Sequence, residues 1–189
     1  MEKVSVENYA ALLEEATLFH GHVCGGIESG TRMTICGLQR IGILDPKGAD
    51  KKKLIVYVEI DRCATDAIMA LTGCRPGKRT MKIVDNGIMA ATFINLESEI
   101  AVRLVSKMRK DSDGKGPMPD FATASDDELF SIMDVKVPMR PEDLPGRPVR
   151  STQCDRCGEK IMDGREIEHQ GKDLCKPCFT QNTYYTPLA

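Results

Sequence analysis

The sequence contains no tryptophan, and aromatic residues account for only 5% of it. Proteins that hold single-stranded nucleic acid stack the bases on aromatic side chains, so this composition offers few such platforms. An excess of positive charge is also missing, because 26 lysines and arginines face 28 acidic residues for a formal net charge of −2. Without a basic field to attract phosphates, nucleic acid is not expected as a partner.

Long apolar runs are missing as well, since no stretch approaches the ~20 residues that a membrane-spanning helix requires. Residues 1–7 carry two acids and lack the apolar segment of a signal peptide. The phosphate-binding loop GxxxxGK(S/T), the glycine fingerprint of dinucleotide-binding folds and a serine-centred nucleophile elbow are all missing. We therefore expect a cytoplasmic protein with no membrane partner, and no substrate follows from these motifs.

Cysteine, in contrast, is abundant, with eight in the chain. Cys154 and Cys157 form one C-x2-C pair, and Cys175 and Cys178 form a second pair after 17 intervening residues. This spacing is typical of a zinc site with four thiolates, a closed tetrahedron that leaves no position for a substrate. Two disulfides or an iron site of similar spacing are the alternatives. We predict a structural zinc ion, because a module this small cannot bury enough surface to fold unaided.

The segment between the two cysteine pairs predicts a treble-clef-like zinc finger. Gly158 allows the turn that aims the first two thiolates, and glycine turns at 163–164 and 170–171 predict a hairpin. Residues 175–179 predict the start of a short helix. His169 is expected on the hairpin surface and not on the metal.

Two segments rich in proline, glycine and charge, 111–120 and 138–148, interrupt the chain. The second of them predicts the domain boundary. We expect a core domain at 1–137, a proline-rich linker at 138–149 and the zinc finger at 150–189.

The core is predicted to be an α+β domain with helices packed on a small mixed sheet. Apolar periodicity predicts helices, with boundaries uncertain by ~2–4 residues, at 6–19, 27–40, 64–71, 97–109 and 126–133. Strands are predicted at 53–60, 81–84, 88–94 and 135–137. Asn86-Gly87 between two apolar runs predicts a hairpin, and Gly30 and Gly37 predict close approach of another helix.

A second group of soft ligands lies in the core. His20, His22 and Cys24 share one glycine-rich turn, and Cys63 is expected at the start of a short helix. A helix N-terminus stabilises an anion, which predicts a lowered pKa for the Cys63 thiol. These groups fit a metal site or a reactive thiol–imidazole pair, provided that folding brings them together. The alternative is that each cysteine is a small buried hydrophobe and each histidine caps a helix.

Further candidates follow that short helix. Cys74 comes after a helix-ending glycine, Gly73, and precedes a basic loop at 75–79. Within this loop, Lys78 and Arg79 are candidate contacts for an anionic group.

The motifs that carry this chemistry resemble a known family. Residues 19–26, FHGHVCGG, resemble the F-H-G-H-x-C-P-G signature of the FmdE family, which is named after formylmethanofuran dehydrogenase, with Gly25 in place of the proline. Residues 61–78 contain C-x-x-D-A-I and T-G-C-x-x-G-K, which resemble that family's second block. The resemblance extends over about residues 8–110, and a zinc finger after the core also fits members of the family.

The resemblance implies a small α+β core that pairs as a homodimer. It implies an accessory or redox protein of one-carbon metabolism that serves a molybdenum or tungsten enzyme, with a Cys/His site that is a candidate for a second metal. The family's candidate catalytic residues would fall on His20, His22, Cys24, Cys63, Asp66, Cys74 and Lys78.

A different class of function remains open, namely a zinc-finger scaffold that binds protein or nucleic acid without catalysis. Basic residues surround the finger: Arg150, Arg156, Lys160, Arg165, Lys172 and Lys176. Acidic residues cancel much of that charge: Glu159, Asp163, Glu166, Glu168 and Asp173. Binding to phosphates by the finger would therefore be weak.

Overall fold

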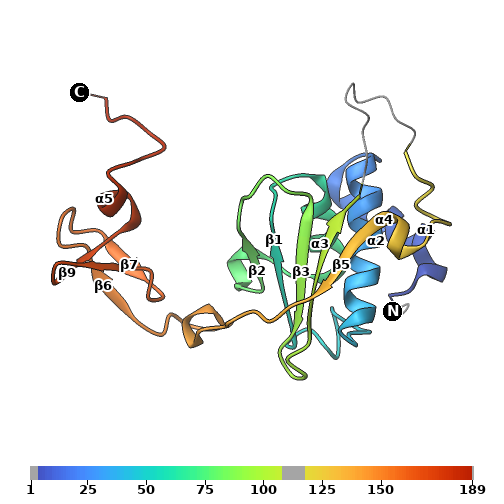
Figure 1. Ribbon diagram of the computed structural model, residues 1–189, viewed down its shortest axis with the longest axis horizontal. Coiled ribbons are helices and arrows are strands. Elements are labelled where there is room, and N and C mark those ends of the chain that lie inside the picture. Colours follow the sequence, from blue (N-terminus) through green and yellow to red (C-terminus); the bar gives the residue numbers. More distant parts are fainter. Residues whose placement is uncertain (1–3, 108–117, 189) are drawn as a thin grey trace. The chain divides into compact units, whose positions relative to one another are not determined.

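The computed structural model describes residues 4–107 and 118–188 (Figure 1). The chain divides into two compact units, Met1–Pro138 and Met139–Ala189, and we describe each by itself. All eight cysteines are free. Among the described residues, no helix combines the length and the apolar character that crossing a membrane requires.

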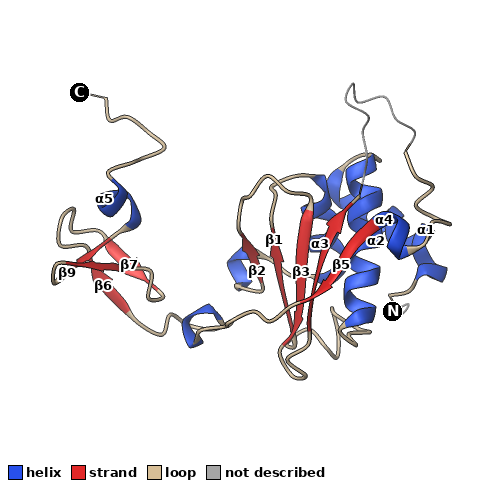
Figure 2. Ribbon diagram, viewed as in Figure 1, coloured by secondary structure: helices blue, strands red, loops and turns tan. Residues whose placement is uncertain are grey.

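The core unit is built on a five-stranded sheet (Figure 2). Its strands are β1 Leu54–Val58, β2 Met81–Ile83, β3 Ala90–Asn95, β4 Ala101–Ser106 and β5 Phe130–Asp134. The spatial order is β2-β1-β3-β4-β5, in which β1 and β2 run parallel and every other neighbouring pair is antiparallel. The sheet is therefore mixed, as predicted.

Helices α1, α2 and α3 gather on one face of this sheet (Figure 1). The helices are α1 Tyr9–His20, α2 Gly25–Arg40, α3 Cys63–Thr72 and the short α4 Asp126–Leu129. Short 3-10 turns lie at Val6–Asn8 and Pro76–Lys78. Alternate residues of the strands join the helices in one hydrophobic cluster, which includes Val56, Phe93 and Leu104.

The predictions for α1, α2 and α3 are confirmed in position and type. Gly73 ends α3 with a φ of 69°, the left-handed conformation expected of a helix-ending glycine. Ser125 begins α4 as predicted, in a capping box in which Ser125 and Glu128 bond to each other's backbone N–H.

The predicted helix at 97–109 is wrong, because residues 101–106 form β4. That prediction rests on the helical spacing of Ile100, Leu104 and Met108, the last of which lies outside the described residues. The decisive pattern is the alternation of Val102 and Leu104, both fully buried, with the half-buried Arg103. A period of two with β-branched residues fits a strand paired on both edges.

The predicted hairpin at Asn86-Gly87 is also wrong. Strands β2 and β3 are not neighbours, because β1 lies between them. The segment is instead a crossover from one side of β1 to the other. It is held to the end of β1 by Glu59, whose carboxylate accepts a hydrogen bond of 3.1 Å from the Asn86 side chain.

The chain near residue 130 turns from helix to strand earlier than predicted. Helix α4 ends at Leu129, and β5 follows at once, whereas the sequence pattern predicts a helix to 133 and a strand at 135–137. Pairing with β4 explains the difference, since Ser106 aligns with Phe130 and Val102 with Asp134. These cross-strand contacts outweigh the helical spacing of the sequence.

The small residues of α2 do allow close packing, as predicted. A Cβ atom at Gly30 would lie 2.7 Å from the Ala64 Cα atom, so α2 and α3 touch backbone to backbone at this point. A Cβ atom at Gly37 would overlap the Phe93 ring of β3. Glycine at position 30 therefore sets the distance between the two helices.

The C-terminal unit contains two small hairpins and one short helix. Strands β6 Ser151–Gln153 and β7 Lys160–Met162 form the first hairpin, and β8 Ile167–His169 and β9 Lys172–Leu174 form the second. A 3-10 turn lies at Pro141–Asp143, and α5 spans Lys176–Thr180.

The two glycine turns of this unit have different roles. Gln170 and Gly171 both have positive φ and close the β8–β9 hairpin, as predicted. Asp163 and Gly164 also have positive φ, but they connect the two hairpins and do not close a strand pair.

Candidate metal centres

The four cysteines of the C-terminal unit converge on one point. Their sulfur atoms all lie within 4.8 Å of one another, and the Sγ atoms of Cys157 and Cys175 are 3.8 Å apart. A tetrahedron with Zn–S bonds of about 2.3 Å has edges of about 3.8 Å, so the spacing fits a zinc ion. Cys154 and Cys157 lie between β6 and β7, while Cys175 caps α5 and Cys178 lies within it.

Backbone amides in this site favour thiolates. The N–H groups of Cys157 and Cys175 point to the Cys154 sulfur and lower the pKa of that thiol to about 6. The Cys175 N–H lies 3.3 Å from it. Because zinc binds the thiolate form, these donors prepare the site for the ion. His169 is outside this group and packs edge-on against the Phe179 ring, at 5.5 Å between centroids.

A second cluster lies in the core, where His20, Cys24 and Cys63 place their donor atoms within 4.8 Å of one another. His20 is the last residue of α1, and Gly21, with a φ of 101°, turns the chain away from the helix. Cys24 is the N-cap of α2, and Cys63 is the first residue of α3. The sequence hypothesis required that Cys24 and Cys63 meet, and the fold brings them together.

The imidazole of His20 has one partnered and one unpartnered nitrogen. Its Nδ1 atom donates to Asp66 Oδ2 at 2.8 Å, which assigns the proton to Nδ1 and leaves the Nε2 lone pair available. Nε2 is buried and has no hydrogen-bond partner among the described residues. A buried, unpaired nitrogen is costly unless something binds it. A carboxylate behind a histidine is the usual support of a metal-binding imidazole.

Gly26 lets the two thiols approach each other. A Cβ atom at this position would lie 2.9 Å from the Cys63 Cβ and within 3.7 Å of both sulfur atoms. Any side chain there would push the start of α3 away from the start of α2. Gly26 was not predicted as a site residue. A signal was present in the sequence: Gly25 and Gly26 stand in the first turn of a helix, where glycine is unfavourable.

The start of α3 is held in place by the turn that precedes it. Thr65 donates its hydroxyl to the Ile60 carbonyl at 2.7 Å, and the Thr65 N–H donates to the Arg62 carbonyl at 2.8 Å. This turn connects α3 to β1, a strand with neighbours on both sides. The position of Cys63 is therefore fixed by the centre of the sheet.

A cavity of about 400 Å³ opens beside the core cluster. Polar residues His20, Asp61, Arg62, Thr65 and Asp66 line it together with Cys63, Met69 and Ile83. It has room for a small molecule next to the donor atoms. No pattern in the sequence pointed to the lining residues Arg62, Thr65, Met69 and Ile83.

The predicted lowering of the Cys63 pKa is wrong. Burial raises the pKa of this thiol, and the neighbouring Cys24 raises it further through a hydrogen bond and its charge. The helix start is outweighed by the burial of the thiol and then by the facing Cys24. A raised pKa disfavours the thiolate, which argues against a free nucleophile at this position.

The remaining predicted residues His22, Cys74 and Lys78 are not among the converging donor groups of this cluster. The His22 residue is exposed and its ring lies against the His20 ring, with 4.6 Å between centroids. Cys74 is buried past the far end of α3, with its sulfur 4.0 Å from the Leu54 carbonyl oxygen. Lys78 lies near Cys74 in a separate cavity.

Residues 19–130 match the family described as FmdE, molybdenum formylmethanofuran dehydrogenase operon. This match spans more than half of the chain and contains the whole core cluster. The chain belongs to the FmdE family. Residues 147–184 of this FmdE protein match the prokaryotic dksA/traR C4-type zinc finger, so the C-terminal unit is a zinc finger with four cysteine ligands.

Two known proteins resemble this FmdE-family chain. The crystal structure of a tungsten formylmethanofuran dehydrogenase FmdE-like protein from Syntrophus aciditrophicus aligns with a TM-score of 0.55 at 19% identity, covering 94% of this chain and 95% of that one. This likeness shows a shared fold. A probable S-adenosyl-L-methionine-binding protein of Archaeoglobus fulgidus is 30% identical over 94 residues, which are 49% of this chain and 26% of that protein. The chain thus matches about a quarter of the length of that relative.

Proposed function

We propose that the core of this FmdE-family protein binds one transition-metal ion through His20 Nε2 and the thiolates of Cys24 and Cys63. The carrying observation is the buried Nε2 atom, which has no partner among the described residues. It belongs to a histidine that places a ring nitrogen within 4.8 Å of two cysteine sulfur atoms. Two cysteines and one histidine form a ligand set that suits zinc. Three protein ligands leave the fourth position open, which is typical of catalytic zinc and not of structural zinc.

The open position would face the 400 Å³ cavity, so that a small molecule could reach the ion. When bound, such an ion supplies Lewis-acid polarisation of an oxygen atom. The chain's own residues have supporting roles. Asp66 keeps the proton on His20 Nδ1, and Met69 and Ile83 supply apolar side chains to the lining of the cavity.

We further propose that the cavity serves one-carbon metabolism, as an accessory or redox site beside a molybdenum or tungsten enzyme, with the chain acting as a homodimer. The family description and the name of the related structure both refer to formylmethanofuran dehydrogenase, and they support this assignment. The zinc finger then has a structural role, separate from the core site.

Metal analysis tests the core site directly. The full chain purified with zinc should contain two ions per molecule, and Cys24→Ser or Cys63→Ser should each reduce this to one. Asp66→Asn should retain the second ion but bind it about 10–100-fold more weakly, because the imidazole loses its support. Cys36→Ala is the matched control, since Cys36 is a buried cysteine of α2 outside both clusters. A single ion in the unmodified protein would refute the proposal. The alternative function, a zinc-finger interaction module without a metal in the core, would then stand.

A second experiment tests the link to one-carbon chemistry. Cobalt(II) in the core site should give a visible thiolate absorption, and formate, a one-carbon anion, should shift this spectrum by occupying the open position. Cys63→Ser should abolish the shift, while Cys36→Ala should keep it. If the cobalt spectrum forms but formate leaves it unchanged, the metal site stands and the one-carbon assignment fails.

A further inference from the structure

A separate cavity of about 340 Å³ lies at the C-terminal end of α3. Its lining includes Lys47, Lys51, Lys52, Cys74, Lys78 and Thr80. The metal cluster lies at the opposite end of the same helix, because Cys63 begins α3 and Gly73 follows its last residue. The two sites are therefore distinct.

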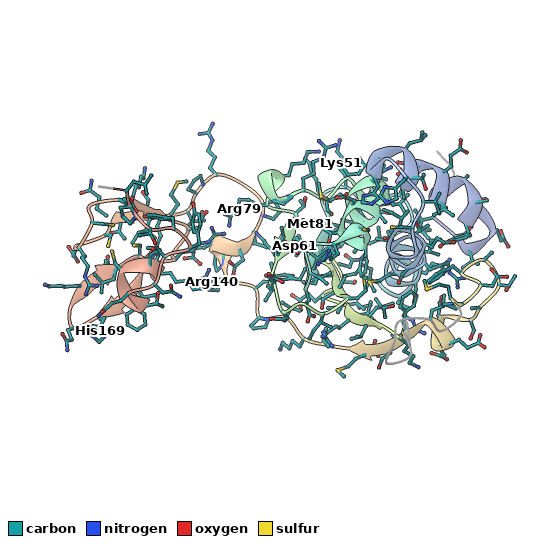
Figure 3. All side chains as sticks on the ribbon, turned by 90° about the horizontal axis from the view of Figure 1, so that it is seen from above. Lys51, Asp61, Arg79, Met81, Arg140 and His169 are labelled. Carbon is teal, nitrogen blue, oxygen red and sulfur yellow. The ribbon has the colours of Figure 1, made fainter. Side chains whose placement is uncertain are left out.

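The charge of this cavity is strongly one-sided. Four of its lining residues are lysines, and none is acidic. Lys47 is paired with Glu15, but no carboxylate within the described part of the chain pairs with Lys51, Lys52 or Lys78. This concentration of positive charge occurs in a chain with a formal net charge of −2. Lys51 lies at the periphery of the core, where a ligand from solvent can reach it (Figure 3).

Two acidic side chains adjacent in sequence to lining residues, Asp45 and Asp50, are hydrogen-bonded to the loop itself. Asp45 accepts backbone N–H groups from Gly48 and Ala49, and Asp50 accepts those of Leu44 and Asp45. Asp50 also pairs with Lys53, which is not a lining residue. These carboxylates stabilise the loop that carries Lys51 and Lys52. Neither of them lines the cavity or forms an ion pair with its lysines.

The base of the cavity is neutral. The Thr80 hydroxyl oxygen accepts the Arg75 N–H at 3.0 Å, and the Thr80 side chain is hydrogen-bonded to the Cys74 thiol. Cys74 at the base is buried, and burial raises the pKa of its thiol, so it adds no negative charge.

We propose that this cavity binds a small molecule carrying at least two phosphate groups. Ammonium groups act as point charges that suit tetrahedral phosphates, whereas planar carboxylates favour the fork of arginine, and no arginine lines the cavity. Several lysines around one cavity also favour a ligand with several charges over a single anion. The site does not depend on the metal proposed for the core.

Calorimetric titration of the full chain with inorganic pyrophosphate at low salt tests the proposal. Saturable binding at one site per chain is expected, with orthophosphate at least tenfold weaker because it spans fewer lysines. Replacing Lys51, Lys52 and Lys78 together by glutamine should weaken pyrophosphate binding on the order of tenfold or more. Cys63→Ser should leave pyrophosphate binding unchanged, which separates this site from the metal centre.

The matched control removes the same charge elsewhere, with Lys136, Lys160 and Lys172 replaced by glutamine. These lysines are exposed and lie outside the cavity. Equal weakening in this control would overturn the proposal, because binding would then follow overall charge. The proposal would also fail if pyrophosphate did not saturate a site. A lower melting temperature of the first triple variant would then show that the lysines only offset the negative C-terminal end of α3.

Discussion

Replacing Cys175 with serine is expected to unfold the C-terminal unit and leave the core folded. The apolar cluster of this unit contains only Cys154, Ile161 and Leu174 as buried members among the described residues, too few to stabilise it without the ion. Binding of structural zinc supplies about 10–16 kcal/mol in comparable small modules. Zinc analysis should register the loss of the finger's ion, and limited proteolysis should cleave within residues 139–188 while sparing the core.

The matched control for this experiment is His169→Ala. This histidine lies close to α5 and packs on Phe179, but it is not one of the four ligands. The variant should keep its zinc and resist the protease. Loss of zinc from it would mean that the histidine belongs to the ligand set, against both the sequence prediction and the observed geometry.

Replacing Gly30 with alanine should destabilise the core by about 2–3 kcal/mol, within the range of overpacked cores. The new methyl group would lie 2.7 Å from the Ala64 Cα atom and 2.8 Å from its carbonyl oxygen, which forces α2 and α3 apart. Alanine is otherwise the better helix residue, by about 1 kcal/mol, so a loss of stability would identify the contact as the cause. Denaturant unfolding followed by circular dichroism measures the effect.

The same substitution should weaken metal binding at the proposed core site, because Cys24 and Cys63 stand at the starts of these two helices. Gly77→Ala provides the control, since no atom lies within 4 Å of the added methyl group and its φ is not in the left-handed region. Its stability should stay within about 0.5 kcal/mol of the original. If Gly30→Ala were equally neutral, the helices would have room to separate without cost.

The sequence predicted the helical layer and strands β1, β2 and β3 well, and strands β4 and β5 poorly. Helices α1, α2 and α3 have clear local signals, such as the apolar spacing of Leu12 and Ala16 and the helix-ending Gly73. Strand β4 does not, because Leu104 satisfies both a helical and an alternating pattern. Only pairing with β3 and β5 decides between them, and such pairing joins residues far apart in the sequence.

The same limit explains the false hairpin. Asn86-Gly87 is a strong local signal, but β3 pairs with the far edge of β1 and not with β2, so the connection must pass over β1. The strand order, with β1 between β2 and β3, is a property of the whole sheet. The residues near position 86 alone do not determine it.

The candidate site was predictable in its members but not in its geometry. The crowding of His20, His22 and Cys24 in one turn identified the region, and the structure joins His20 and Cys24 to Cys63. It also separates Cys74 from them, although Cys63 and Cys74 flank the same helix. The role of Asp66 as the partner of His20 required the packing of α1 against α3, which the sequence does not encode locally.

The core donors come from two mechanically different parts of the fold. Cys63 follows β1, which is hydrogen-bonded on both sides and buried over most of its length. His20 and Cys24 flank the short, exposed connection of residues 21–23. One side of the proposed metal site is thus anchored to the sheet and the other to this connection, so an ion of different radius would displace the connection and leave the sheet undisturbed.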